Sequence, residues 1–324
     1  MTLPRTLKLT GVLAAAALTL TACSSSSPSA DGAEEVSAYP EGDITFIVQA
    51  AAGGGSDLTS RALASELEKE LGVSVIVENR PGASGSTAMQ YIADSDPDGY
   101  TIGFVPVEIS MLAHQGFDID PANYDFLGQI MLAPGVISVP NDSPFETLDD
   151  LVAAGKSGSV TMANSGAGSI WEAAELGLAD LTGATVVPVP FDGGGPAVAA
   201  VMGNQVDAAV GGTAETAAAH NGGQLRALAV LHDERHPLLP DVETAEELGY
   251  DLNFGGWGGV YAPTGLPDDV REALADAIAT SAQSDSFVDT ITKSGALSVY
   301  KTPAEFTDFI DDEYSRFASL LEVK

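Results

Sequence analysis

The sequence predicts an α/β fold of two similar lobes, because strand-like and helix-like segments alternate in two separate runs. The runs span residues 43–105 and 159–231. Segments rich in β-branched and aromatic residues that end at turn residues are typical of strands, and apolar residues repeating every three to four positions are typical of helices. Alternation of the two indicates mostly parallel sheets. The segment after Trp257 is then expected to return to the first lobe.

The first run begins with DITFIVQ (43–49), whose β-branched residues and glycine-rich end predict a strand. The helix expected next, at 57–71, places Leu58, Ala62, Leu63 and Leu67 on one face. Ser56 and Asp57 are alternative N-cap residues for this helix. The other elements expected here are a strand at 73–78, a helix at 86–93 and a strand at 100–105.

The second run is preceded by segments at 126–132 and 136–139 that are expected to be extended, and by a helix at 148–154. The run itself contains predicted strands at 159–163, 185–190, 206–211 and 225–231, with helices at 169–181 and 197–202. The C-terminal part adds a strand at 257–262 and helices at 267–283, 287–293 and 303–321.

The N-terminus has the pattern of a secretory signal. Arg5 and Lys8 precede about ten apolar residues, which are too few to span a bilayer. The segment ends Leu-Thr-Ala-Cys23, which resembles the lipobox of bacterial lipoproteins, where the cysteine is lipidated and becomes the first mature residue. We therefore expect a signal peptide at 1–22, a lipid anchor at Cys23 and a flexible tether at 23–38. As the single cysteine, Cys23 also excludes an intrachain disulfide.

The chain is strongly acidic, with a formal net charge of −33. Removal of the signal would delete two cations and no acids, giving −35. Nucleic-acid binding needs a basic face, so this charge excludes nucleic acid as a partner. The remaining length is typical of two domains.

Four glycine- or serine-rich loops follow predicted strands: AAAGGGSD (50–57), NRPGASGS (79–86), NSGAGS (164–169) and FDGGGP (191–196). Open α/β sheets bind ligands at the carboxyl ends of their strands. Glycine lets backbone N–H groups approach a ligand, and the helix that follows directs its positive dipole end there. Serine adds hydroxyl donors. The loops therefore predict capture of an anion in a cleft between the lobes, although any one loop could merely turn the chain.

The known nucleotide and catalytic motifs do not fit. GGGSD lacks the lysine of a phosphate-binding loop, and neither Gly53-x-Gly55 nor Gly166-x-Gly168 has the third glycine of a dinucleotide site. There is no G-x-S-x-G elbow. His232 and His236 have the spacing of a metal pair, but prolines follow at once, so a solvated turn is expected. No cofactor and no metal are predicted.

Several stretches in order along the mature chain resemble the tripartite tricarboxylate transporter substrate-binding receptors, the Bug/TctC-like family. The most specific are ENRPGASG and DPDGYT, and VPVPFDGGGPA, GNQVDAAV and WGGVYAPTGLP extend the match. The resemblance implies a periplasmic-binding-protein-like (type II-like) fold, with lobe 1 at 39–135 and 255–324, lobe 2 at 136–254, and a hinge between them. It also implies a monomer that is not an enzyme.

The family's ligand contacts carry over to the first glycine loop and to the serine–glycine loop of lobe 2, with the second loop adding two residues. The predicted contacts are Ala52, Gly53, Gly54, Gly55, Ser56, Asp57, Ala83, Ser84, Asn164, Ser165, Gly166, Gly168 and Ser169. Asp57 has two possible roles: it could fix its own helix start, or it could recognise an amino or hydroxyl group on the ligand.

The sequence departs from the family at three places in the expected pocket. Trp171 stands where the family often has histidine, Phe191-Asp192-Gly193 replaces tyrosine–lysine–glycine, and Gly211 replaces a frequent acid. The pocket has lost a cation, so one wall is expected to be more apolar or aromatic.

The predicted function is an extracytoplasmic receptor, lipid-anchored to the cell membrane, that delivers a small organic acid to a tripartite-type permease. Two alternatives stay open at this stage. The receptor could instead present its ligand to a sensor kinase, or the scaffold could support an extracellular enzyme.

Overall fold

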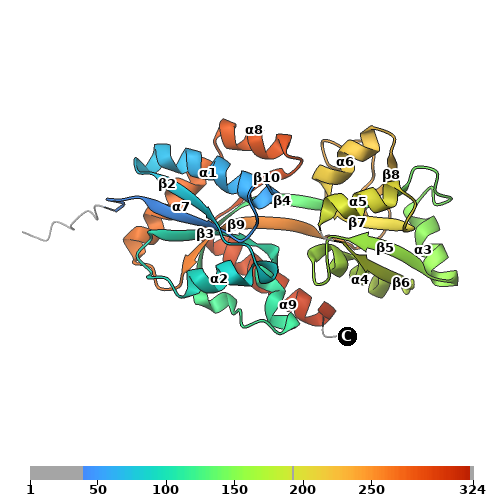
Figure 1. The fold of residues 1–324 in the computed structure, drawn as a ribbon, viewed down its shortest axis with the longest axis horizontal. Coiled ribbons are helices and arrows are strands. Elements are labelled where there is room, and N and C mark those ends of the chain that lie inside the picture. Colours follow the sequence, from blue (N-terminus) through green and yellow to red (C-terminus); the bar gives the residue numbers. More distant parts are fainter. Residues whose placement is uncertain (1–38, 192, 322–324) are drawn as a thin grey trace, which may run out of the picture. The chain divides into compact units, whose positions relative to one another are not determined.

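The first predicted run folds into three parallel strands with a helix on each face (Figure 1). The computed structural model describes residues 39–191 and 193–321. β1 (Ile44–Val48) lies between β2 (Val75–Asn79) and β3 (Thr101–Pro106) and pairs in parallel with both. α1 (Gly55–Leu71) and α2 (Ser86–Ala93) connect them. All five elements predicted for this run are confirmed to within two residues.

β1 is apolar at four of its five positions because both of its faces are covered. Phe46 packs in one core cluster with Leu63 of α1, and Ile47 packs in another with Met89 and Ile92 of α2. Leu58 was expected on the buried face of α1, but its side chain is 50% exposed. Five residues separate it from Leu63, which turns it roughly 140° around the helix and away from the core.

The second run repeats this plan. β5 (Val160–Asn164) lies between β6 (Val186–Pro190) and β7 (Ala208–Gly212), again in parallel. α3 (Leu148–Ser157) and α4 (Ile170–Thr182) supply the core cluster on one face of these strands. α5 (Gly194–Met202) and α6 (Thr213–Asn221) lie on the other, and α6 was not predicted.

Two strands connect the halves. β4 (Tyr124–Pro140) pairs with β9 (Gly255–Pro263) through residues 124–134, and then with β7 and β8 (Leu225–Leu231) through residues 135–140. The strand order is β2-β1-β3-β9-β4-β7-β5-β6, with β8 and β10 (Leu297–Lys301) also pairing with β4. All pairings of β4 are antiparallel, as is that of β3 with β9. The expectation of mostly parallel sheets is therefore wrong, because the chain reverses direction each time it crosses between the halves.

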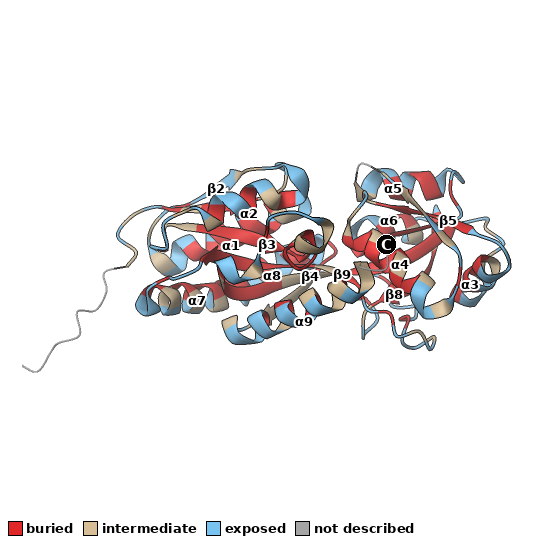
Figure 2. Ribbon diagram, turned by 90° about the horizontal axis from the view of Figure 1, so that it is seen from below, coloured by how far each residue is buried: buried red, intermediate tan, exposed pale blue. Residues whose placement is uncertain are grey.

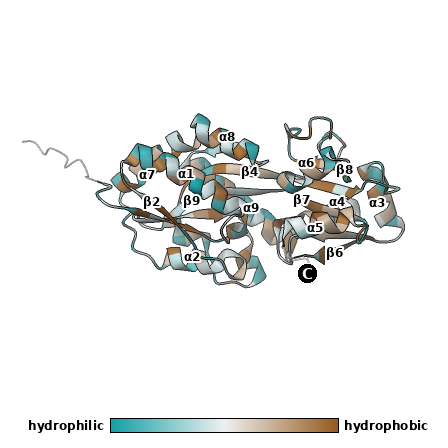
Figure 3. Ribbon diagram, turned by 45° about the horizontal axis from the view of Figure 1, so that its top comes forward, coloured by the Kyte–Doolittle hydropathy of each residue, from teal (hydrophilic) through white to brown (hydrophobic). Residues whose placement is uncertain are grey.

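The C-terminal part returns to the first half, as predicted. α7 (Asp268–Ala282) and α8 (Asp285–Lys293) share a core cluster with α1, and α9 (Pro303–Leu321) packs on the face that α2 covers. The central strands are mostly red in Figure 2, and the outer helix faces are largely pale blue. In Figure 3 brown residues lie mainly on the strands and on the inner faces of the helices, whereas teal residues lie on the outer faces. The α/β prediction with two lobes is confirmed by this arrangement.

Candidate functional site

A cavity of about 560 Å³ lies where three of the four glycine-rich loops meet. It is lined from lobe 1 by the first and second loops and from lobe 2 by the third. The predicted contacts that line it are Gly55, Ser56, Ala83, Ser84, Ser165, Gly166, Gly168, Ser169 and Trp171. The structure places Ala52, Gly53, Gly54, Asp57, Asn164, Phe191, Gly193 and Gly211 outside the lining, and Asp192 lies outside the described residues.

The first loop is held in place by hydrogen bonds to the carboxylate of Asp57. Asp57 is 2% exposed, and its Oδ2 accepts from the backbone N–H of Gly53 at 2.8 Å and from Nε of Arg61 at 3.1 Å. Its Oδ1 accepts from Nδ2 of Asn79 at 2.8 Å. The Arg61 hydrogen bond, with those of Gly53 and Asn79, lowers the pKa of Asp57 to about 2. Of its two proposed roles, this geometry favours the structural one.

The N-cap prediction for α1 is wrong. The helix begins at Gly55, and its N-cap is Gly54, which makes no side-chain capping bond. Ser56 and Asp57 both lie inside the first turn, where the Asp57 carboxylate is favourably placed beside the helix dipole. Gly53 has φ +86°, a conformation that glycine adopts without strain and that turns the chain into the helix.

Asp57→Asn is expected to destabilise the protein by about 1 to 2 kcal/mol at pH 7, because the exposed Arg61 is partly screened. The folded pKa is depressed, so the stabilisation is present above the ordinary value of 3.8 and is lost as pH falls toward 2. Urea unfolding of both proteins at pH 7 and pH 3 checks this. The difference in free energy of unfolding between the two proteins should be smaller at pH 3 than at pH 7. If the difference were the same at both pH values, ionisation of Asp57 would contribute nothing to stability.

The second loop carries backbone strain at the cavity. Gly82, Ala83, Ser84 and Gly85 all have positive φ, and the values for Ala83 and Ser84 are +46° and +56°. Non-glycine residues seldom adopt this region, and such strain concentrates at binding sites. The loop forms η1 (Ala83–Gly85), and Gly85 is the N-cap of α2.

The third loop is held from both lobes. Asn164 accepts from Gly166 N–H at 3.0 Å and donates to Oε2 of the buried Glu175 at 2.9 Å, so it supports the loop from beneath. Ser169 caps α4 by accepting from the Glu172 N–H. From lobe 1, Nε2 of Gln115 in η3 (Leu112–Gln115) donates to the Gly168 carbonyl at 2.9 Å. This last bond crosses the cleft.

Trp171 forms a wall of the cavity. Its side chain is largely buried, and its ring packs against glycines of three strands. A Cβ placed on Gly135, Gly212 or Gly256 would lie 3.0, 3.5 or 3.8 Å from the ring. The bare backbone of β4, β7 and β9 therefore makes room for the indole.

The fourth loop supports the third instead of lining the cavity. Phe191 N–H donates to the Asn164 carbonyl at 3.0 Å, and Gly193 N–H donates to the Ser165 carbonyl at 3.2 Å. β6, which precedes this loop, is the outermost strand of its half and lies far from β1 and β3. Gly211 lies within β7 and is buried, so it does not reach the cavity either.

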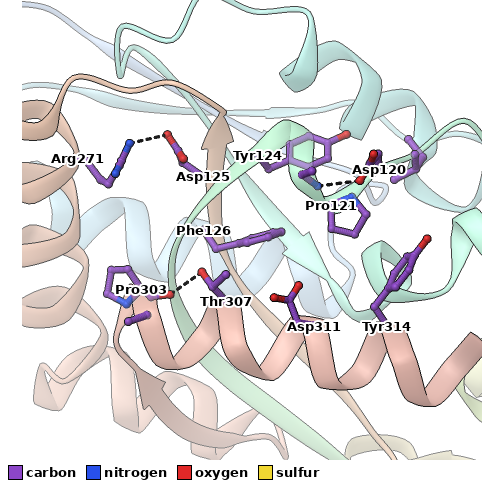
Figure 4. Close-up of a pocket in the computed structure, with 13 residues that line it drawn as sticks. Asp120, Pro121, Tyr124, Asp125, Phe126, Arg271, Pro303, Thr307, Asp311 and Tyr314 are labelled. Carbon is purple, nitrogen blue, oxygen red and sulfur yellow. Dashed lines mark hydrogen bonds and ion pairs between the residues drawn. The ribbon is translucent and has the colours of Figure 1, made fainter.

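A second cavity, of about 700 Å³, is a poor site for an anion. It lies between α9 and the start of β4, and its wall carries the carboxylates of Asp120, Asp125 and Asp311 (Figure 4). The guanidinium of Arg271, which also lines it, is 3.3 Å from Asp125. Pro263, which pairs with the start of β4, lies at the other end of β9 from the cleft, about 20 Å along an extended strand. None of the predicted contacts lines this cavity.

The solvated turn expected at His232 and His236 is found only in part. Residues 233–235 between the two histidines are exposed and His232 is half-buried, with its Nδ1 accepting from the Glu234 N–H. His236 is instead 2% exposed, and its Nδ1 accepts from the Leu238 N–H. Across residues 39–191 and 193–321, no group of three or more His, Cys, Asp or Glu residues is placed to hold a metal ion. No helix within the same ranges has the length and apolarity needed to cross a bilayer.

The sequence pattern of the family described as "Tripartite tricarboxylate transporter family receptor" matches residues 59–324. The chain belongs to this family. The receptor is 32% identical to protein BugT of Bordetella pertussis, over 87% of its own chain and 89% of BugT. It is 30% identical to the UPF0065 protein in the TAR-I ttuE-ttuC' intergenic region of Agrobacterium vitis, over 89% and 86% of the two chains. The predicted resemblance is thus confirmed.

Solved structures share the receptor's fold. A TctC solute-binding protein from Polaromonas superposes with a TM-score of 0.80 at 28% identity, covering 88% of this chain and all of the other. The periplasmic binding protein BugD gives 0.73 at 28%, covering 88% and 98%. MatC from Rhodopseudomonas palustris, with bound malate, gives 0.74 at 26%, covering 87% and 100%. The family and these neighbours are solute-binding proteins and not enzymes, as predicted.

Sequence reasoning missed part of the receptor's cavity. The missed residues are Gln49, Gly82, Gly85, Phe104, Pro106, Val107, Glu108, Met131, Ala167, Ile170 and Gly256. Some of them follow from the rule that ligands bind at the carboxyl ends of parallel strands. Because β3 is parallel to β1, the residues at its carboxyl end should also face the cleft. Of the residues that the structure describes, those lining this cavity include no lysine, arginine or histidine.

Proposed function

We propose that this receptor captures a small organic acid outside the cytoplasmic membrane and delivers it to a tripartite-type permease. The observation that carries the proposal is the convergence of helix starts on one cavity. Gly55 and Ser56 of α1, Gly85 before α2, and Ser169 before α4 all line it. Helix N-termini present unpaired N–H groups and a positive dipole end, so three of them together favour a carboxylate without a basic side chain.

The hydroxyl groups complete this set of donors. Ser56, Ser84, Ser165 and Ser169 line the cavity, and the Ser169 oxygen already accepts from the Glu172 N–H, which leaves its hydrogen to donate. MatC, a relative with the same fold, is described with bound malate, a dicarboxylate. A carboxylate ligand for this chain is consistent with that relative and with the cavity's donors.

Ligand capture would close the two lobes about the strands that connect them. We assign lobe 1 to 39–135 and 255–324 and lobe 2 to 136–254, because β4 changes partners at Gly135 and β9 begins at Gly255. The Gln115–Gly168 hydrogen bond would then form only in the closed state. A ligand that contacts both lobes shifts the equilibrium toward this state.

Lipidation of Cys23, which lies outside the described residues, would hold the receptor at the membrane surface, and the segment 23–38 would serve as a tether. The acidic surface would keep the receptor soluble and monomeric. A permease would receive the ligand from the closed receptor.

A thermal-shift screen with di- and tricarboxylates, amino acids and aromatic acids tests the binding step. We expect at least one acid to raise Tm in a concentration-dependent manner, since a ligand at 100 times its Kd stabilises the folded state by about 2.7 kcal/mol. Small-angle scattering should show compaction with the same acid. Failure of every acid to raise Tm would exclude carboxylate capture.

A further inference from the structure

Two side chains that line the cleft cavity, Glu108 and Gln49, carry hydrogen-bond acceptors. Glu108, in η2 (Val107–Ser110) directly after β3, lines the cavity, and within the described ranges no basic side chain pairs with it. Gln49, at the end of β1, donates from Nε2 to the Ser56 hydroxyl at 3.1 Å. Its Oε1 is buried and has no partner among the described residues. Both acceptors belong to lobe 1.

Among the described residues that line the cavity, Glu108 is the only one with an ionisable side chain, and when ionised it has the same sign of charge as the proposed ligand. A carboxylate removed from water is destabilised unless it is paired, and burial raises the pKa of Glu108 accordingly. Repulsion of a carboxylate ligand would add to this penalty. The residue can favour binding only if the ligand itself brings a donor.

We propose that Glu108 and Oε1 of Gln49 bind a positively charged amino group, so that the ligand is a small amino acid rather than a plain di- or tricarboxylic acid. This inference rests on the proposed function, because the helix N-termini and serines still hold the ligand's carboxylate. An ammonium group offers three donors and a full positive charge, and a positive charge beside Glu108 would favour the ionised form of its carboxyl group. A ligand hydroxyl would offer one donor and no charge.

The rest of the cavity defines the body of the ligand. Phe104, Met131 and Trp171 line it with apolar surface. The volume of about 560 Å³ exceeds that of a carboxylate and an amino group alone. An amino acid with an apolar or aromatic side chain therefore fits the charges, the acceptors and the walls together.

The test compares matched pairs of acids that differ only in the α-amino group. L-Phenylalanine and 3-phenylpropionate, L-leucine and 4-methylpentanoate, and L-glutamate and glutarate are titrated into the full mature chain by calorimetry, with citrate and malate alongside. We expect at least one amino acid to bind about 10- to 100-fold more tightly than its partner, the range for a charge-assisted hydrogen bond. Glu108→Gln should remove this preference and change the Kd of the amino-free partner by less than about threefold.

Asp118→Asn is the matched control, because Asp118 is an exposed acid of the same segment that does not line the cavity. It removes the same charge, and it should leave both Kd values unchanged. The comparison within each pair uses the unmodified protein, so the result does not depend on the folding of a variant.

Three outcomes would overturn the inference. An amino-free acid, citrate or malate could bind as tightly as any amino acid, or Glu108→Gln could weaken both members of a pair alike. Glutarate could bind more tightly than glutamate and tighten further at low pH, which would mean that protonated Glu108 donates to a second carboxylate. Each of these leaves the proposed function intact. Absence of binding by every acid would overturn the proposed function as well.

Discussion

Glu175→Gln is expected to stabilise the receptor by about 3 kcal/mol at pH 7. Glu175 lies on α4 beneath the third loop and is fully buried, and Nδ2 of Asn164 donates to its Oε2 at 2.9 Å. Burial, with a smaller contribution from the nearby charge of Glu172, raises the pKa of Glu175 to about 9. Glutamine has nearly the same shape, keeps an oxygen for Asn164 and never ionises.

Glu175 differs in ionisation between the folded and unfolded chains. In the unfolded chain Glu175 ionises near its ordinary value of 4.5, whereas in the folded protein it stays protonated up to about pH 9. A raised folded pKa gives stability that is fully present below pH 4.5 and is lost as pH rises through 9. pH 7 lies about 2.5 units above the ordinary pKa of 4.5, and each unit lowers the free energy of unfolding by about 1.4 kcal/mol.

Urea unfolding at pH 4.5, 7 and 9 measures this effect. The variant should match the wild type at pH 4.5, and its advantage should grow with pH. Asp180→Asn removes an exposed acid from the same helix and should show no such trend. If Glu175→Gln were equally stable or less stable than the wild type at pH 9, Glu175 would have to be ionised and stabilised by other groups.

Most elements of the fold could be predicted because their apolar patterns are local. α6 escaped prediction because TAETAAAHN has no strong apolar stripe, and its burial depends on packing of Thr213, Thr216 and Ala217 against neighbouring strands. β10 is five residues long and only half buried, so its pairing with β4 decides its conformation. β4 was predicted as two segments because Pro134 and Gly135 interrupt it. In the structure Thr213 donates to the Pro134 carbonyl where the strand changes partners.

The candidate site was predicted in part, since strand order decides which loops meet. The rule that ligands bind at the carboxyl ends of parallel strands selected the first three loops, and these line the cavity. It also selected the fourth, which only the position of β6 at the edge of the sheet excludes. Individual contacts were harder. The sequence cannot show that the Asp57 carboxylate accepts hydrogen bonds from Gly53, Arg61 and Asn79. Asn79 in particular is distant from Asp57 along the chain.

Trp171→Ala is expected to destabilise the receptor by about 3 to 5 kcal/mol, the range for truncation of a large buried aromatic side chain. The indole fills the space over Gly135, Gly212 and Gly256, and these glycines have no side chains that could close the gap. The same ring lines the ligand cavity, so its loss should also weaken binding of any acid found in the screen. Thermal unfolding without ligand measures the first effect, and calorimetric titration measures the second.

Trp171→Phe is the matched control for this prediction. Phenylalanine keeps an aromatic ring over the glycines, so it should retain more than half of the lost stability and most of the affinity. The two measurements separate the two roles of the side chain. If Trp171→Ala lowered the affinity but reduced the free energy of unfolding by less than about 1 kcal/mol, the indole would contribute to ligand binding alone. Its packing against the three glycines would then not be needed for stability. If it cost stability without changing affinity, the ring would be a support for the connecting strands, and the apolar wall of the cavity would have to come from Phe104 and Met131.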